Sequence, residues 1–142
     1  MKLKALVFLS LVVVMLTYSA TSCAAFQKSF NNLTYSAMSM TSSDEVLVSG
    51  RIFKRVINNR RSAERQLKTS ELLLISRLVE DLDLTLINDL DVPSKRHRFD
   101  GAMLALVKVQ IGEKIYESVP FDHDNPPEQL RPLVDYLISI SP

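Results

Sequence analysis

Apolar and polar residues alternate in three stretches of the first half of the chain, and this period of two is typical of half-buried strands. The first stretch covers residues 33–40, the second covers 45–57 and the third covers 62–68. Ser49-Gly50 interrupts the second stretch and marks a bulge or a tight turn there. We therefore predict three strands before the first helix.

The pattern changes to a helical period near residue 70. Thr69 or Ser70 suits the N-cap position, and Glu71 suits the positive end of the helix dipole. Apolar residues then recur at spacings of one and three, which places five of them on one face of a helix: Leu74, Ile75, Leu78, Val79 and Leu82. We predict that a helix begins at Thr69–Ser70 and buries this face.

Two further alternating stretches, 102–111 and 115–121, flank Gly112-Glu113-Lys114 and predict a hairpin. A two-residue turn would place Ile111 opposite Lys114 and would mix polar residues into the apolar face. A three-residue turn keeps one face mostly apolar. We predict this second register, which has three pairs: Ile111 with Ile115, Val107 with Val119, and Ala105 with Phe121.

A second helical stripe lies near the end of the sequence and contains Leu130, Leu133, Val134, Leu137 and Ile140. Pro132 cannot lie deep inside a regular helix, because its ring collides with the carbonyl four residues earlier. We therefore predict that the helix begins near Arg131–Pro132. The predicted order is βββαββα, an α+β fold in which an antiparallel sheet of about five strands carries two helices on one face. Residues 33–142 would form one domain.

The first 22 residues have the three parts of an export signal. Lys2 and Lys4 precede an apolar stretch at 5–16, and small and polar residues follow it. The apolar stretch is shorter than the roughly 20 residues that a transmembrane helix needs. We therefore predict a cleaved signal peptide at 1–22 and a tether at 23–32.

Cys23 is the one cysteine of the chain, and small residues occupy positions 20–22 before it. This SATSC stretch resembles the lipobox of bacterial lipoproteins, in which the signal is cut before the cysteine. The resemblance implies a lipid anchor on Cys23, with a diacylglycerol and palmitate-type chains, in a membrane of the cell envelope and facing the periplasm or the exterior. The alternative is ordinary cleavage after Ala24 or Ala25, which would release a periplasmic or secreted protein.

The net charge of the chain limits the kinds of partner that it can bind. The chain has 17 basic and 16 acidic residues, and loss of Lys2 and Lys4 with the leader leaves a net charge of about −1. A nucleic-acid-binding domain needs a clustered basic surface, so we predict no nucleic-acid partner. We interpret the two densest basic groups, Arg60-Arg61 and Lys95-Arg96-His97-Arg98, as solvated loop charge. The alternative is that they contact a partner or anionic lipid headgroups.

The candidate chemistry lies in two short groups that contain both histidines. His97 precedes Asp100 in RHRFDG, and His123 follows Asp122 in FDHD. The first group precedes one strand of the hairpin and the second follows the other strand, so the two groups can meet at one end of the sheet. A metal site or an acid–base site is one hypothesis. The other is that these residues form loop ends and helix caps.

Other catalytic motifs do not occur. The chain has three glycines, which excludes a glycine-rich phosphate loop, and no Gly-x-Ser-x-Gly motif. We therefore predict neither an enzyme nor a cofactor.

The second half of the chain resembles the emfourin family, which consists of small inhibitors of thermolysin-like metalloproteases. A helix, a charged loop, a hairpin and a proline-led helix follow one another in TSELLLISRLVEDL, RHRFDG, ALVKVQIGEKIYESV and PPEQLRPLVDYL. The resemblance implies this order of elements and a role in binding a protein. It assigns no role to a single residue, because the Gly-Gly-Phe opening of that family is missing and only Ser49-Gly50 lies near the equivalent place.

These features lead us to expect an exported, membrane-anchored small lipoprotein that acts as a protein-binding module, like an inhibitor or an immunity protein. Its partners would be the membrane, through the N-terminal lipid, and an envelope protein or a protease. Two alternatives stay open. One is a metal-dependent or enzymatic protein that uses His97, Asp100, Asp122 and His123, and the other is a released structural protein.

Overall fold

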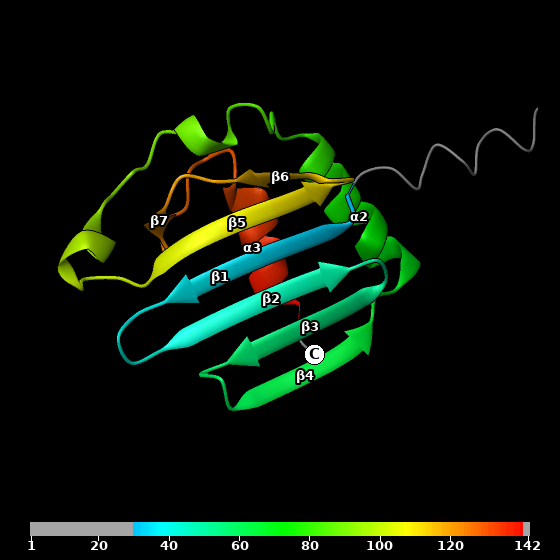
Figure 1. Ribbon diagram of the computed structural model, residues 1–142, viewed down its shortest axis with the longest axis horizontal. Helices are drawn as coiled ribbons and strands as arrows, with labels where there is room; N and C mark the ends of the chain where they lie inside the picture. The colour runs from blue at the N-terminus through cyan, green and yellow to red at the C-terminus, as the bar shows by residue number, and fades with distance from the viewer. Residues whose placement is uncertain (1–29, 141–142) are drawn as a thin grey trace, which may run out of the picture.

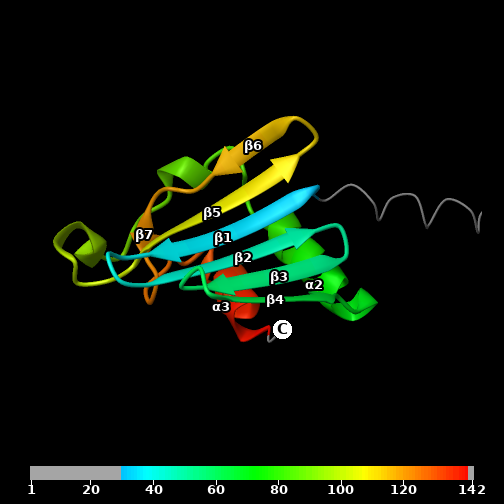
Figure 2. The same ribbon diagram turned by 60° about the horizontal axis from the view of Figure 1, so that its bottom comes forward.

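One antiparallel sheet carries two helices on a single face (Figures 1 and 2). The computed structural model describes residues 30–140, so the predictions for the signal peptide at 1–22, for Cys23 and for most of the tether lie outside the described residues. The strands are β1 (Asn32–Met38), β2 (Ser43–Ser49), β3 (Ile52–Ile57), β4 (Arg61–Gln66), β5 (Leu104–Ile111), β6 (Lys114–Glu117) and β7 (Phe121–Asp122). The helices are α2 (Thr69–Glu80) and α3 (Arg131–Ser139).

The strand order is β4-β3-β2-β1-β5-β6, and β7 pairs with β5 beyond the end of β6. Residues of β1 alternate between the two faces, as the sequence pattern predicts. Leu33, Tyr35 and Ala37 are almost completely buried, whereas Thr34 and Ser36 on the other face are half-buried. The core lies between the sheet and the helices, which contribute Ile75, Val79, Leu133, Val134 and Leu137.

The opposite side of the sheet has no helix over it, and Figure 1 looks onto this side. We call it the open face; its central positions are Thr34, Ser36, Leu47, Leu104 and Leu106, all half-buried. Apolar and polar side chains are therefore mixed across it. No helix in the described part of the chain is long and apolar enough to span a membrane.

The α+β class is confirmed, but the predicted count of about five strands and the predicted order βββαββα are wrong. The order is ββββαβββα. Residues 45–57 form two strands because Gly50 takes a φ of 56° and turns the chain together with Arg51. The second additional strand is β7, whose two residues are too few to produce a recognisable period.

The predicted hairpin register is wrong for β6 and correct for β7. Gly112-Glu113 form a two-residue turn, which places Ile111 opposite Lys114. Gly112 has a φ of 60°, the conformation that glycine provides at the first position of such turns. Ala105 nevertheless lies opposite Phe121, as predicted. The register therefore shifts by one residue between β6 and β7.

Ser118 makes this shift possible. Its backbone N–H donates to the carbonyl of Val107 at 2.9 Å, and its hydroxyl accepts from the N–H of Val107 at 3.0 Å. A side-chain oxygen thus takes the place of a backbone carbonyl, and Pro120 has no N–H that needs a partner. As a consequence, Ile115 lies on the open face and is 62% exposed rather than packed in the core.

Helix α2 begins where the sequence predicts, although Lys68 occupies the N-cap position in place of Thr69 or Ser70. The Glu71 carboxylate accepts the N–H of Lys68 at 2.7 Å. Arg65 of β4 donates two further hydrogen bonds to Glu71, at 2.9 and 2.8 Å. Glu71 therefore ties the first turn of α2 to the edge strand.

Helix α3 begins at Arg131 with Pro132 in its first turn, as predicted. Its last turn is held to the sheet by Arg55, which donates to Asp44 at 2.9 and 2.6 Å and to the carbonyl of Ile138 at 3.0 Å. The last carbonyls of a helix lack partners within it. Arg55 satisfies one of them and fixes the helix over the core.

The Glu71 ion pair predicts a dependence of stability on pH. The hydrogen bonds from Arg65 and from the Lys68 amide lower the pKa of Glu71 to about 2. Because this pKa lies below the unfolded value of about 4.3, the contribution is complete above about pH 5 and is lost as the pH falls towards 2. We expect Glu71→Gln to lower the free energy of unfolding by about 1–2 kcal/mol at pH 7, since the pair is partly exposed and screened.

Urea unfolding at pH 7 and at pH 2.5 measures this effect. The difference between the native chain and Glu71→Gln should largely disappear at the lower pH. Glu128→Gln, at an exposed position, is the matched control and should be close to neutral at both. A penalty for Glu71→Gln of the same size at both pH values would contradict the prediction.

Candidate functional site

A buried carboxylate organises one end of the sheet. Asp122 is 0% exposed, and donors surround both of its oxygens. Oδ1 accepts the backbone N–H of His97 at 2.8 Å and its ring Nδ1–H at 2.6 Å. Oδ2 accepts the backbone N–H of Arg96 at 3.0 Å and the hydroxyl of Ser94. The segment from Ser94 to His97 is thus wrapped around one side chain.

Asp122 is ionised in this setting. Burial alone would raise its pKa, but the hydrogen bonds from Ser94, from the two backbone amides and from His97 outweigh burial and hold the pKa well below its usual range. A carboxylate has no proton to donate, so His97 must donate through Nδ1. The other ring nitrogen of His97, Nε2, has no hydrogen-bond partner among the described residues.

Strand alternation separates the four residues that the sequence analysis proposed as a site. Asp122 lies opposite Leu104 and points to the open face, where it meets His97. His123 points to the covered face, where its Nδ1 is hydrogen-bonded to the hydroxyl of Tyr35. Asp100 is exposed and follows the 3₁₀ turn Arg96–Phe99 in a left-handed conformation, with a φ of 56°. The structure therefore brings His97 and Asp122 into contact, places exposed Asp100 at the hollow that His97 also lines, and leaves His123 on the other face.

Tyr35 and His123 form a separate polar pair at the margin of the core. Burial raises the pKa of Tyr35, and the nearby Asp44 carboxylate raises it further. The phenol therefore keeps its proton, and its hydroxyl is hydrogen-bonded to Nδ1 of His123. In the described ranges no three His, Cys, Asp or Glu side chains are grouped so that they would hold a metal ion.

Further polar contacts connect Asp122 to α3. Ser94 accepts a hydrogen bond from the Asn125 side chain at 3.0 Å, and Asn125 accepts one from Arg131 at 3.1 Å. On the solvent side, Arg96 pairs with Asp124 at 2.6 Å. The sequence analysis noted that the two histidine-containing groups can meet at one end of the sheet, and these contacts place both of them there.

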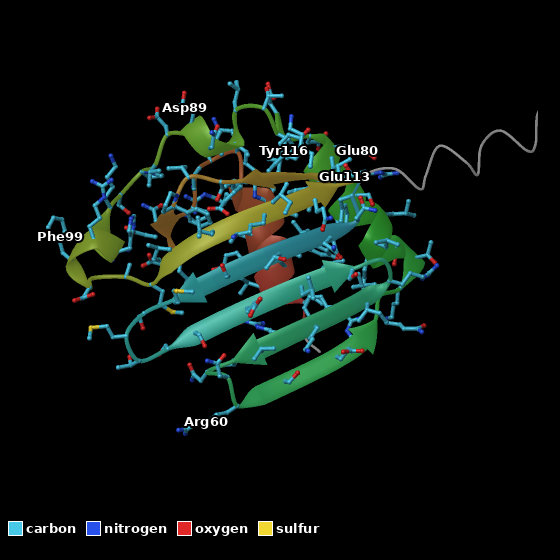
Figure 3. All side chains as sticks on the ribbon, in the orientation of Figure 1. Arg60, Glu80, Asp89, Phe99, Glu113 and Tyr116 are labelled. Atoms are coloured by element: carbon cyan, nitrogen blue, oxygen red, sulfur yellow. The ribbon has the colours of Figure 1, made fainter. Side chains whose placement is uncertain are left out.

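Exposed apolar side chains surround this network. Phe99 is 85% exposed and Met40 is 90% exposed, and Figure 3 shows Phe99 at one extreme of the molecule. We call this region, formed by residues 38–42, 94–103 and 122–125, the Phe99 end. A hollow of about 440 Å³ lies within it, between the β1–β2 loop and the segment around His97. Lys95 and Arg98 are exposed here without an ion pair inside residues 30–140.

The sequence analysis did not identify Phe99 or Met40 as functional residues. Phe99 stands among charged residues in RHRFDG, outside any apolar period, and that isolation was the available indication. Met40 continues the alternation of β1 into a loop, so the pattern assigned it to a strand. An isolated large apolar residue in a polar loop has no core to enter, and its exposure follows from that.

Comparison with family models, with curated proteins and with solved structures finds no match to this chain.

The geometry of Asp122 leads to a stability prediction. Asp122→Asn would turn one acceptor oxygen into an N–H₂ group that faces existing donors, so buried donors would lose their partner. We expect the free energy of unfolding to fall by about 3 kcal/mol. Asp124→Asn removes an exposed carboxylate and should cost less than about 1 kcal/mol.

Urea unfolding gives the two free energies, and hydrogen exchange of the Arg96 and His97 amides reports on the network itself. Faster exchange of these two amides is expected in Asp122→Asn and not in Asp124→Asn. Equal stability and equal exchange in the two variants would refute the central role of Asp122.

Proposed function

We propose that this chain is an exported module, anchored through a lipid on Cys23, that binds a partner protein with the Phe99 end. The observation that carries the proposal is the 85% exposure of Phe99 on a loop that is held in place. Soluble proteins have little reason to display a phenylalanine on a protruding turn, whereas aromatic residues are enriched at the centres of protein interfaces.

The rigidity of the loop supports a binding role. The amides of Arg96 and His97 are bound to Asp122, and Gly101 N–H donates to the carbonyl of Arg96 at 3.0 Å. Phe99 lies between these fixed points. Binding through a loop that is already ordered loses less conformational entropy than binding through one that must become ordered.

The path of the chain supports an orientation in which the Phe99 end points away from the membrane. β1 begins at the end of the sheet opposite Phe99, where Asn31 accepts the N–H of Gly112; Figure 3 shows Glu113 and Phe99 at opposite ends. The seven residues of β1 extend over about 23 Å. A lipid on Cys23 would lie nine positions before Asn32, within about 30 Å of the start of β1. The Phe99 end would then face away from the membrane.

The partner class follows from the same surface. Lys95 and Arg98 flank the exposed phenylalanine, so a partner with an apolar pocket and acidic groups around it is the best fit. An envelope protein is the proposed partner. The resemblance of the second half of the chain to emfourins makes a protease the specific case to test.

The anchor is tested by the mass of the mature N-terminus. Expression of the full chain in a bacterial host should yield a product that begins at Cys23 and carries acyl chains. Two or more acyl chains anchor a protein stably, so this product should sediment with membranes and Cys23→Ser should not. A mature chain that begins at Ala25 or Phe26 without acyl mass would refute the anchor.

The binding surface is tested by photo-crosslinking from single positions of the full chain in its native host. A benzophenone side chain in place of Phe99 should give a discrete adduct with a partner protein. The same group in place of Ile115, which is 62% exposed on β6, is the matched control and should not. Equal adducts from both positions, or none from Phe99, would argue against the Phe99 end.

A companion variant separates binding from folding. Phe99→Ala should leave the free energy of unfolding within about 0.5 kcal/mol, because the side chain has little to pack against. It should still remove the interaction with the partner that crosslinking identifies. If Phe99→Ala loses stability but still binds the partner, Phe99 would be a structural residue and not a binding residue.

A further inference from the structure

All three methionines of the described residues line one hollow, together with one histidine. Met38, Met40 and Met103 lie around the space of about 440 Å³ at the Phe99 end, and His97 forms part of the same wall. Met38 and Met40 are 55% and 90% exposed, so their thioether groups are not committed to the core.

The pairing of strands explains why these residues meet. Met38 lies opposite Leu104, and Leu104 lies opposite Asp122, so the three form one row across β1, β5 and β7. Directly opposed residues point to the same face, which here is the open face. Met103, which precedes Leu104, packs partly against the core and also lines the hollow. His97 is bound to Asp122 at the other end of the row. Met38 and His97 therefore both border the hollow, on either side of Leu104.

The hydrogen bond to Asp122 prepares His97 as a ligand. With Nδ1–H donated to a carboxylate at 2.6 Å, Nε2 is the ring nitrogen left to bind a ligand. Histidine ligands of metals commonly donate their other ring N–H to such a carboxylate, which fixes the tautomer and the ring orientation. Each buried side-chain nitrogen and oxygen within residues 30–140 has a partner. The unpartnered Nε2 is accordingly not fully buried, in a His97 side chain that is 6% exposed.

The chemistry of the four groups selects a class of metal. Thioethers are soft, uncharged ligands and favour Cu(I), and imidazole is compatible with it. Zn²⁺, Ca²⁺ and Mg²⁺ bind through thiolates, several imidazoles or carboxylates. The one carboxylate that also borders the hollow belongs to Asp100, which is exposed at the rim. A monovalent soft cation is the matching ligand.

We infer that Met38, Met40, Met103 and His97 form a binding site for Cu(I), with Ag(I) as its chemical equivalent. The site is separate in its chemistry from the proposed contact with a partner, which depends on Phe99. Met38-Ser39-Met40 supplies two sulfurs two residues apart. Hydrogen bonds between Ser39 and Ser42 close the β1–β2 loop that carries Met40. The carboxylate of Asp122 orients His97 and does not touch the metal.

Metal binding is measured on the purified full chain in detergent with Cys23→Ser in all samples, because the thiol of Cys23 would itself bind Cu(I). Competition with bicinchoninate under reducing conditions gives stoichiometry and affinity. We expect one Cu(I) per chain. Met38→Ile and His97→Asn should each raise the Kd by at least about 10-fold. His97→Asn keeps an N–H donor towards Asp122 and removes Nε2.

Methionine methyl spectra identify the ligands directly. Titration with Ag(I) should shift the methyl signals of Met38, Met40 and Met103. Leu47→Ile, on the open face and outside the lining of the hollow, is the matched control and should not alter the Kd. Zn²⁺ should bind at least about 100-fold more weakly than Cu(I) at this hollow.

The outcomes separate the hypotheses. Cu(I) binding that survives Met38→Ile and His97→Asn combined, or Ag(I) titration that moves none of the three methyl signals, would overturn the site. Zn²⁺ binding of equal strength would overturn its soft character. Urea unfolding of each variant shows whether the fold persists, and the methyl titration of the parent chain decides the question even if one variant does not fold. Crosslinking from position 99 is independent of all these results.

Discussion

The ionised carboxylate of Asp122, held without contact to water, is the constraint on which the rest of this structure depends. A charge removed from water costs several kcal/mol unless polar groups replace the water. Here two backbone amides, a hydroxyl and an imidazole replace it, and three of these four donors lie on residues 96 and 97. If the loop moved away, the carboxylate would lose these donors. The two residues of β7 likewise remain in the sheet because Asp122 anchors them to the loop.

This constraint also divides the chemistry of the chain between two faces. Asp122 and His123 are neighbours in sequence, but alternation sends them to opposite sides of the sheet. His123 is used on the covered side, where it is hydrogen-bonded to the buried hydroxyl of Tyr35. His97 keeps one nitrogen unpartnered on the open side. The two histidines stand beside aspartates in similar short motifs. His123 nevertheless has a structural role, whereas His97 keeps a ring nitrogen that can bind a ligand.

The sequence predicts those features that repeated local patterns determine, and it fails where single long-range contacts decide. Both helices were predicted at the correct start, because five apolar residues at helical spacing leave few alternatives. The register of β6 was predicted wrongly. It depends on the hydroxyl of Ser118, which takes the place of a carbonyl only when Val107 lies opposite to it. The meeting of residues 97 and 122 was predicted as a possibility of topology, since both groups flank one hairpin. The pattern of a loop does not show which face of the sheet a side chain points to or how deeply it is buried. The contact between His97 and Asp122 and the exposure of Phe99 depend on both.

The two proposed properties of the Phe99 end are mechanically linked. His97 and Phe99 belong to the same 3₁₀ turn, and Met38 and Met40 belong to the loop that faces it across the hollow. A cation held by His97 on one side and by the methionines on the other would join these two segments. The β1–β2 loop would then be held beside the segment that carries Phe99, and by linkage a partner that contacts both segments would tighten the metal site by the same factor. Such coupling needs no movement of the sheet, because Asp122 already fixes one of the two segments and only the β1–β2 loop must adjust.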